Sequence, residues 1–347
     1  MNERRREFLR VCGLGGIGVM ASPALAWATR IRVLEEAGDA GRPILLGQVS
    51  PDFQRMASGL RVGPAQAAGG LLVFWLRVKE APAALEVATL EEARARGQLL
   101  ITERDQATVP ELLVENRGKT PVLLLAGEIL LGGKQNRVLK EDILLPPLSG
   151  PRNIGVYCVE QGRWAGPAKG FESKGSFAAP GLRAKVLERA DQGQVWAGVS
   201  EYARRAQAPS PTRSYQEVYE KKEVKDHLAE VERGIDQRAA PEALGAAVFV
   251  GGRLAGLDLF LDADLFAREW PKLLRAQALD AYREPSPAEA AEARLRGRVE
   301  ALLRLAASVE GTLREGAGLG RLFEFRLKGA RGTALVFDDR VIHAAIL

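Results

Sequence analysis

The sequence is poor in the residues that bind transition metals or form disulfide bonds. Its 347 residues include only two cysteines and two histidines. Only Cys158 lies beyond the first 26 residues, so the rest of the chain has no second cysteine for an internal disulfide. His227 and His343 stand far apart, and no cysteine or histidine spacing typical of a zinc or iron site occurs. We therefore expect neither a metal site nor a bound cofactor.

Other familiar functional patterns are missing as well. The chain has no phosphate-binding loop of the type G-x-x-x-x-G-K-[ST] and no G-x-S-x-G motif of a serine nucleophile. The formal net charge is only +5, and the first 26 residues contribute two of these charges through four arginines and two glutamates. Because the remaining excess is small and spread along the chain, we expect no nucleic-acid partner.

The first residues match a twin-arginine export signal. Arg5 and Arg6 are followed by one spacer, the apolar pair Phe8-Leu9 and a basic residue. An uncharged stretch, 11–26, ends in Ala-Leu-Ala, an A-x-A cleavage site, and a second such site ends at Ala28. The stretch has 16 residues, whereas a membrane-spanning helix needs about 20. We expect a signal peptide over 1–26, cleaved after export by the twin-arginine machinery to the periplasm or beyond, with no stable membrane insertion.

The remaining chain of about 320 residues suits one large domain or two smaller ones. After an N-terminal arm, 27–44, short apolar runs separated by turn residues predict a β-rich lobe over 45–164. The order of these runs is typical of an antiparallel meander. The predicted strands are 71–78, 98–103, 110–118, 121–133, 136–147 and 153–164.

The second half of the chain mixes helices and strands. The segment 165–240 starts with a loop rich in glycine, proline and lysine and continues as helices. The segment 241–347 predicts strands around Gly251-Gly252, a helix starting at Pro271, and further strands at the end. The predicted class is α+β: an antiparallel β-meander lobe, a helical segment and a second αβ lobe. We expect 241–347 to form one compact unit with 45–164.

Four segments resemble motifs of a bacterial family, the ARG and rhodanese-phosphatase-superfamily-associated domain. They read "LLLAGEILLGGKQNR", "CVEQGRW", "QVWAGV" and "GLDLFL…REWPKLL". The resemblance covers about residues 45–347. It implies no established activity. The family name reflects gene neighbourhoods that include ADP-ribosylglycohydrolases, so the resemblance implies a link to ADP-ribose or related nucleotides by association.

Two groups of polar residues are candidate sites. The first group lies on the predicted apolar hairpin 126–147, and the second lies where the strand 153–164 ends. A carboxylate, a guanidinium and an indole can together clamp a polar ligand and stack a flat ring. The structural alternatives are a solvated hairpin tip with one ion pair, and a strand-edge salt bridge beside a core tryptophan. The candidates are Glu128, Lys134, Gln135 and Arg137 in the first group, and Glu160, Arg163 and Trp164 in the second.

The hairpin allows a prediction of register. If Gly132-Gly133 is a two-residue loop, Leu131 faces Lys134, and Glu128 lies directly across from Arg137. The hypothesis is that this pair orients Arg137 towards the second group.

Three further residues have structural interpretations. Asp258 alternates with leucines, which is typical of the solvent face of a strand. His343 lies among apolar residues and is expected to be a core or edge histidine with satisfied nitrogens. Cys158 is expected to be a small buried hydrophobe.

Three functions remain open, and whether the protein is an enzyme is uncertain. The first is a binding or sensing module that holds a small anionic or nucleotide-like ligand through Lys134, Arg137 and Arg163. The second is a hydrolase that uses Glu128 and Glu160 as acid and base. The third is a structural or interaction protein of the cell envelope.

Overall fold

The computed structural model describes residues 47–347, except 80–84, 105–107, 166–169 and 286–290. The expected signal peptide, 1–26, and arm, 27–44, lie outside the described residues. The residues from Gly47 to Leu347 form one compact unit that combines helices with largely antiparallel sheets. The predicted α+β class is confirmed.

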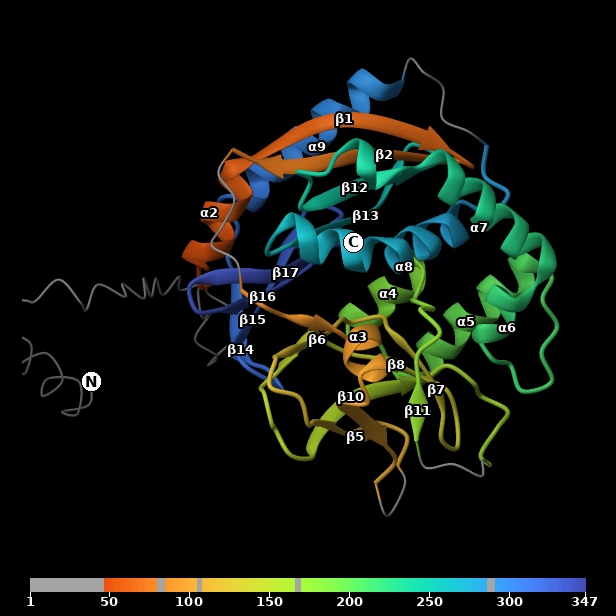
Figure 1. Cartoon of the computed structure of the whole chain (residues 1–347). Helices are drawn as coiled ribbons and strands as arrows, with labels where there is room; N and C mark the ends of the chain where they lie inside the picture. Colours follow the sequence, from red (N-terminus) through yellow and green to blue (C-terminus); the bar gives the residue numbers. More distant parts are fainter. Residues whose placement is uncertain (1–46, 80–84, 105–107, 166–169, 286–290) are drawn as a thin grey trace, which may run out of the picture. The chain divides into compact units, whose positions relative to one another are not determined.

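The largest sheet joins the beginning of the described chain to its end (Figure 1). It has eight strands in the order β1-β2-β12-β13-β17-β16-β15-β14, and all neighbours are antiparallel. The strands of the predicted lobe 45–164 thus divide between this sheet and two others. The eight strands are β1 Leu60–Ala68, β2 Leu71–Val78, β12 Gly245–Val250, β13 Arg253–Phe260, β14 Gly311–Glu315, β15 Arg321–Leu327, β16 Ala330–Phe337 and β17 Arg340–Ile346.

The middle of the chain builds two smaller sheets. Six strands lie in the order β11-β7-β8-β10-β5-β4, and three lie in the order β3-β6-β9. The pair β3–β6 is parallel, which departs from a pure meander. The strands are β3 Ala88–Thr89, β4 Leu99–Thr102, β5 Glu111–Asn116, β6 Val122–Leu124, β7 Ile129–Gly132, β8 Arg137–Leu139, β9 Ile143–Leu145, β10 Arg152–Cys158 and β11 Phe171–Glu172.

The helices cover both faces of the eight-stranded sheet. Helices α2 (Pro51–Gly59) and α9 (Glu292–Ala306) pack together beside one face, and α8 (Ala263–Ala281) packs on β12 and β13. The remaining helices are α3 Leu90–Ala95, α4 Pro180–Leu187, α5 Gln192–Ala206, α6 Gln216–Glu220, α7 Lys222–Gly234 and the 3₁₀ helix η1 Gln237–Ala239.

This two-sided cover explains the continuous apolar run of β2. Alternate side chains of a strand point to opposite faces. Phe74 and Leu76 join the core under α2 and α9, whereas Val73 and Trp75 join the core around α8. Burying both faces requires apolar residues at successive positions.

Helix α8 starts earlier than predicted and carries Pro271 in its interior. Asp262 caps its N-terminus, because the Asp262 carboxylate accepts a hydrogen bond of 2.8 Å from the Leu265 N–H. The predicted start at Pro271 was wrong, since the helix buries apolar side chains on both sides of this proline, including Leu265, Phe266 and Leu273. Glu269 and Lys272, on either side of this proline, are both buried.

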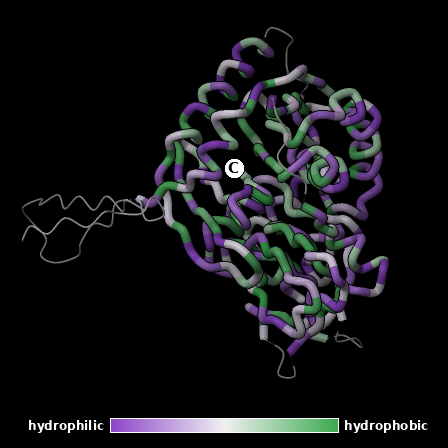
Figure 2. Tube along the Cα trace, turned by 60° about the vertical axis from the view of Figure 1, so that its left-hand side comes forward, coloured by the Kyte–Doolittle hydropathy of each residue, from purple (hydrophilic) through white to green (hydrophobic). Residues whose placement is uncertain are grey.

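Hydrophobic and hydrophilic residues are interspersed along the whole described trace (Figure 2). Across these residues, no helix combines the length and the apolar character needed to cross a membrane.

Candidate functional site

The segment Leu125–Glu128 forms a buried turn between β6 and β7. Gly127 adopts a φ of +107°, and a Cβ there would lie 2.7 Å from Phe177 Cε1, so only glycine fits. Buried carboxylates accept hydrogen bonds from the turn's backbone. Leu125 N–H donates to Glu128 Oε2 at 3.1 Å, and Ala126 N–H donates to Asp142 Oδ1 at 2.8 Å. The turn 125–128 thus contacts two networks of charged residues inside the protein.

The first network surrounds the ammonium group of Lys272. Lys272 Nζ lies 2.9 Å from Glu91 Oε2 and 2.7 Å from Glu269 Oε2, and it also contacts Glu128 Oε1. Glu128, Glu269 and Lys272 are buried, whereas the Glu91 side chain is 38% exposed. We call these four residues the acid cluster. They come from α3, the buried turn and α8.

The acid cluster contains three carboxylates and one ammonium. Burial raises the pKa of Glu128 to about 8, in spite of the attraction of Lys272, and burial also raises the pKa of Glu269. Burial favours a lower pKa for Lys272, but the three carboxylates outweigh it and raise the pKa well above its usual value. Lys272 is therefore charged, and Glu128 retains a proton near neutral pH.

The second network is balanced in charge. His343 Nδ1 lies 2.6 Å from Asp142 Oδ2, and His343 Nε2 lies 3.2 Å from Asp258 Oδ1. Arg183 Nη1 donates to the same Asp258 oxygen at 2.6 Å, and Arg183 Nε donates to Ala126 O at 2.9 Å. Burial favours a lower pKa for His343, but Asp142 and Asp258 outweigh it and raise the pKa to about 9. Two cations thus face two carboxylates.

These positions confirm the prediction for His343, whose nitrogens both have partners, and the prediction that Cys158 is buried. The prediction for Asp258 was wrong. Its side chain is only 4% exposed, because α4 and α8 cover the face of β13 on which it lies.

The predicted register of the hairpin β7–β8 was wrong. Leu130, not Glu128, pairs with Arg137, and Ile129 pairs with Val138. The loop is longer than the glycine pair, because Asn136 Oδ1 accepts a hydrogen bond of 3.0 Å from Gly132 N–H and closes a wider turn. The strand pairing therefore shifts by two residues, and the Glu128 side chain goes to Lys272 instead.

The other six candidates lie together beyond this turn. Arg163 donates to Glu160 Oε2 at 2.6 Å and to Gly133 O at 2.8 Å. The Gln135 amide donates to Glu160 O at 3.1 Å, and Lys134 Nζ lies 5.1 Å from the centroid of the Trp164 ring. Trp164 is 49% exposed. Glu160 and Glu128, the proposed acid–base pair, belong to different networks.

The hairpin tip is largely buried, and the segment of Thr212 and Ser214 contributes to its burial. Thr212 Oγ1 donates to Glu160 Oε1 at 2.8 Å, and Asn136 donates to Ser214 Oγ at 3.1 Å. Arg137 is fully buried, and its Nη1 donates to the backbone and side-chain oxygens of Gln135. Most polar groups of the tip therefore bind protein groups, and Lys134 and Trp164 face the outside.

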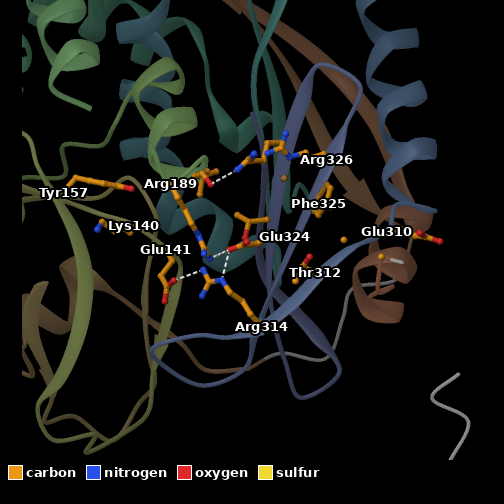
Figure 3. A pocket seen from close by; sticks show the side chains of 16 residues that line it. Lys140, Glu141, Tyr157, Arg189, Glu310, Thr312, Arg314, Glu324, Phe325 and Arg326 are labelled. Atoms are coloured by element: carbon orange, nitrogen blue, oxygen red, sulfur yellow. Dashed lines mark hydrogen bonds and ion pairs between the residues drawn. The ribbon is translucent and has the colours of Figure 1, made fainter. Parts of the chain in front are cut away.

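A separate cleft opens between the small sheets and the end of the large sheet (Figure 3). Its volume is about 850 Å³. Ion pairs run in a chain across it: Arg189 to Glu324 at 2.6 Å, Glu324 to Arg314 at 2.7 Å and Arg314 to Glu141 at 2.7 Å. The chain ties β14 and β15 to the segment after β8 and to the segment after α4.

The cleft has an excess of positive charge. Its charged lining consists of five cations, Lys140, Arg189, Arg314, Arg326 and Arg331, and three carboxylates, Glu141, Glu310 and Glu324. Lys140 Nζ lies 4.2 Å from the centroid of the Tyr157 ring, and burial lowers the pKa of Lys140. Arg326 has no ion-pair partner within the part of the chain that the structure describes.

Sequence reasoning missed the cleft. The alternation of Phe323 and Phe325 with Glu324 and Arg326 indicates that β15 has a polar face, but it does not show what that face meets. The opposite wall comes from Lys140, Glu141 and Tyr157, far away in the sequence.

The fold and the cleft define an α+β domain with a basic cleft. A model of the ARG and Rhodanese-Phosphatase-superfamily-associated Protein domain matches residues 59–347, and the chain belongs to this family. No curated protein and no solved structure matches the chain.

Proposed function

We propose that the protein is a binding or sensing module for a small anionic or nucleotide-like ligand, and that the ligand binds in the cleft of Figure 3. The observation that carries this proposal is the excess of cations in a concave site, five against three carboxylates. A volume of about 850 Å³ falls within the range of about 300–1,000 Å³ typical of small-molecule sites.

The ion-pair chain supports this function by fixing the cations before a ligand arrives. Arg314 is held between Glu141 and Glu324, so little side-chain freedom remains for a ligand to restrict. Among the residues that the structure describes, Lys140 and Arg326 are not held in ion pairs of this kind, and their charges are available to phosphate or carboxylate oxygens.

A thermal-shift screen tests this proposal. The screen uses ADP-ribose, adenosine monophosphate, inorganic phosphate and citrate, so that its arms separate nucleotides from simple anions. A ligand at 100 times its Kd stabilises the fold by about 2.7 kcal/mol, which raises Tm by several degrees. Lys140→Gln and Arg326→Gln should reduce that shift. Arg238→Gln, a control at a side chain that is 88% exposed outside the cleft, should not.

Two results contradict the proposal. One is the absence of a shift with every anion in the screen. The other is a shift that both cleft variants retain in full, which would place the ligand elsewhere, such as near Lys134 and Trp164.

We also propose that the protein is exported by the twin-arginine route. Arg5 and Arg6, the apolar pair after them and the A-x-A site support this proposal. Replacing both arginines by lysine should leave unprocessed precursor in the cytoplasm, as cell fractionation and immunoblotting would show. Normal processing of that variant contradicts this route.

A further inference from the structure

The two buried networks differ in how well their charges balance. In the second network, Arg183 and protonated His343 face two aspartates. In the acid cluster, a single ammonium faces three carboxylates. Buried charges are normally paired, because moving an ion out of water without a partner costs several kcal/mol. The acid cluster thus has more carboxyl groups than its one ammonium can neutralise.

The buried carboxylate of Glu269 points to the same deficit. Its side chain is fully buried, and among the described residues its Oε1 has no partner, whereas its Oε2 is paired only with Lys272. Oε2 lies 2.7 Å from Lys272 Nζ, so the carboxylate is directed into the cluster. The large majority of buried polar side-chain atoms have a hydrogen-bond partner, so the unpartnered Oε1 is an oxygen that a further ligand would satisfy.

The spacing of the carboxylates suits a metal ion. One oxygen from each of Glu91, Glu128 and Glu269 lies within 4.8 Å of the other two. Oxygens bind Mg²⁺ at about 2.1 Å and Ca²⁺ at about 2.3–2.6 Å, so oxygens on one ion lie at most about 4–5 Å apart. Carboxylate oxygen is also the donor that these hard cations prefer.

We propose that Glu91, Glu128 and Glu269 form a binding site for a divalent cation of the Mg²⁺, Mn²⁺ or Ca²⁺ type. Lys272 is the internal counterion that moves aside when the metal binds. Metal binding releases the proton held among the three carboxyl groups, and the divalent cation together with the Lys272 ammonium then balances the three carboxylates. The four-carbon side chain of lysine is flexible enough for this movement.

Access to the site runs past Glu91. The Glu91 side chain is 38% exposed, whereas the other two carboxylates are buried. Ser173 Oγ donates to Glu91 Oε1 at 3.0 Å and holds the carboxylate at the mouth of the cluster. Water completes the coordination on this side, as is usual for Mg²⁺.

Titration calorimetry tests the site. The full protein is treated with EDTA, dialysed and titrated with MnCl₂, MgCl₂ and CaCl₂. We expect one ion per chain for at least one metal. Glu269→Gln and Glu91→Gln should each weaken binding at least tenfold, and Lys272→Met should strengthen it because the competing ammonium is gone. Glu242→Gln, a control at a half-exposed carboxylate elsewhere, should bind like the wild type.

The proposal is overturned if neither the wild type nor Lys272→Met binds any of the three metals below millimolar concentration. Lys272 is then the permanent counterion of the three carboxylates. Unchanged binding in Glu91→Gln overturns it as well. Glu91 lies at the surface end of the cluster, so this variant decides the matter even where Glu269→Gln fails to fold.

Discussion

Replacing Arg183 by methionine tests the balanced network that holds the Ala126-Gly127-Glu128 turn. The change keeps much of the aliphatic volume but removes the guanidinium, which is 2.6 Å from Asp258 and donates to Ala126 O. Breaking a buried ion pair on one side costs about 3–5 kcal/mol, and here it leaves His343 alone to balance the carboxylates of Asp142 and Asp258. The lost hydrogen bond to Ala126 O adds about 1 kcal/mol. We expect a total loss of about 4–6 kcal/mol.

Urea unfolding followed by tryptophan fluorescence measures this loss as a lower midpoint. The double variant Arg183→Met, Asp258→Asn should recover part of the loss, because it no longer leaves one carboxylate in excess of the cations. Arg238→Met, a control at an 88% exposed arginine in an ion pair with Asp236, should leave the midpoint unchanged. The reasoning is refuted if Arg183→Met costs less than about 1 kcal/mol, or if the double variant loses the full sum of the two single losses.

Two other predictions concern stability. The pKa of His343 is about 9 when folded and about 6.5 when unfolded, so its contribution is complete below pH 6.5 and is lost as pH rises through 9. Urea midpoints at pH 6 and 9.5 should therefore differ less in His343→Gln than in the wild type, and an equal difference would contradict this. Gly127→Ala should lower Tm more than the control Gly97→Ala, because both glycines have positive φ but only Gly127 is crowded, and equal losses would contradict this.

Much of the fold could be predicted from local patterns. The apolar run 71–78 coincides with β2, and the turn Gly251-Gly252 joins β12 to β13 as expected. The strand and the turn both depend on residues close together in the chain, whose strand and turn preferences can be recognised in the sequence. The pairing partners of each strand cannot be predicted from local sequence in this way. The sheet that joins β2 to β12 brings together segments that are far apart in the chain.

The errors came from tertiary contacts. Asp258 alternates with leucines as an exposed residue would, yet α4 and α8 cover its face of β13 and bury it. The register of β7–β8 depends on the Asn136 side chain, which closes a turn wider than the glycine pair. The effect of a single side chain on loop length could not be inferred from the residue types alone.

The candidate site was predicted only in part. Six of the seven candidates lie together, because they come from two segments next to each other in one sheet. The basic cleft and the acid cluster were missed. Each assembles residues from segments with no common local pattern, such as Glu91 on α3 and Glu269 on α8.

Titration calorimetry decides whether the cleft is a ligand site. The wild type and the double variant Lys140→Gln, Arg326→Gln are each titrated with ADP-ribose and with pyrophosphate. A charge-assisted hydrogen bond contributes about 1.5–3 kcal/mol, which corresponds to at least a tenfold change in Kd for each cation removed. We predict saturable binding of at least one of these ligands at one site per chain, and at least a hundredfold weaker binding in the double variant. Wild-type protein that binds neither ligand, or a double variant with unchanged Kd, would contradict this function.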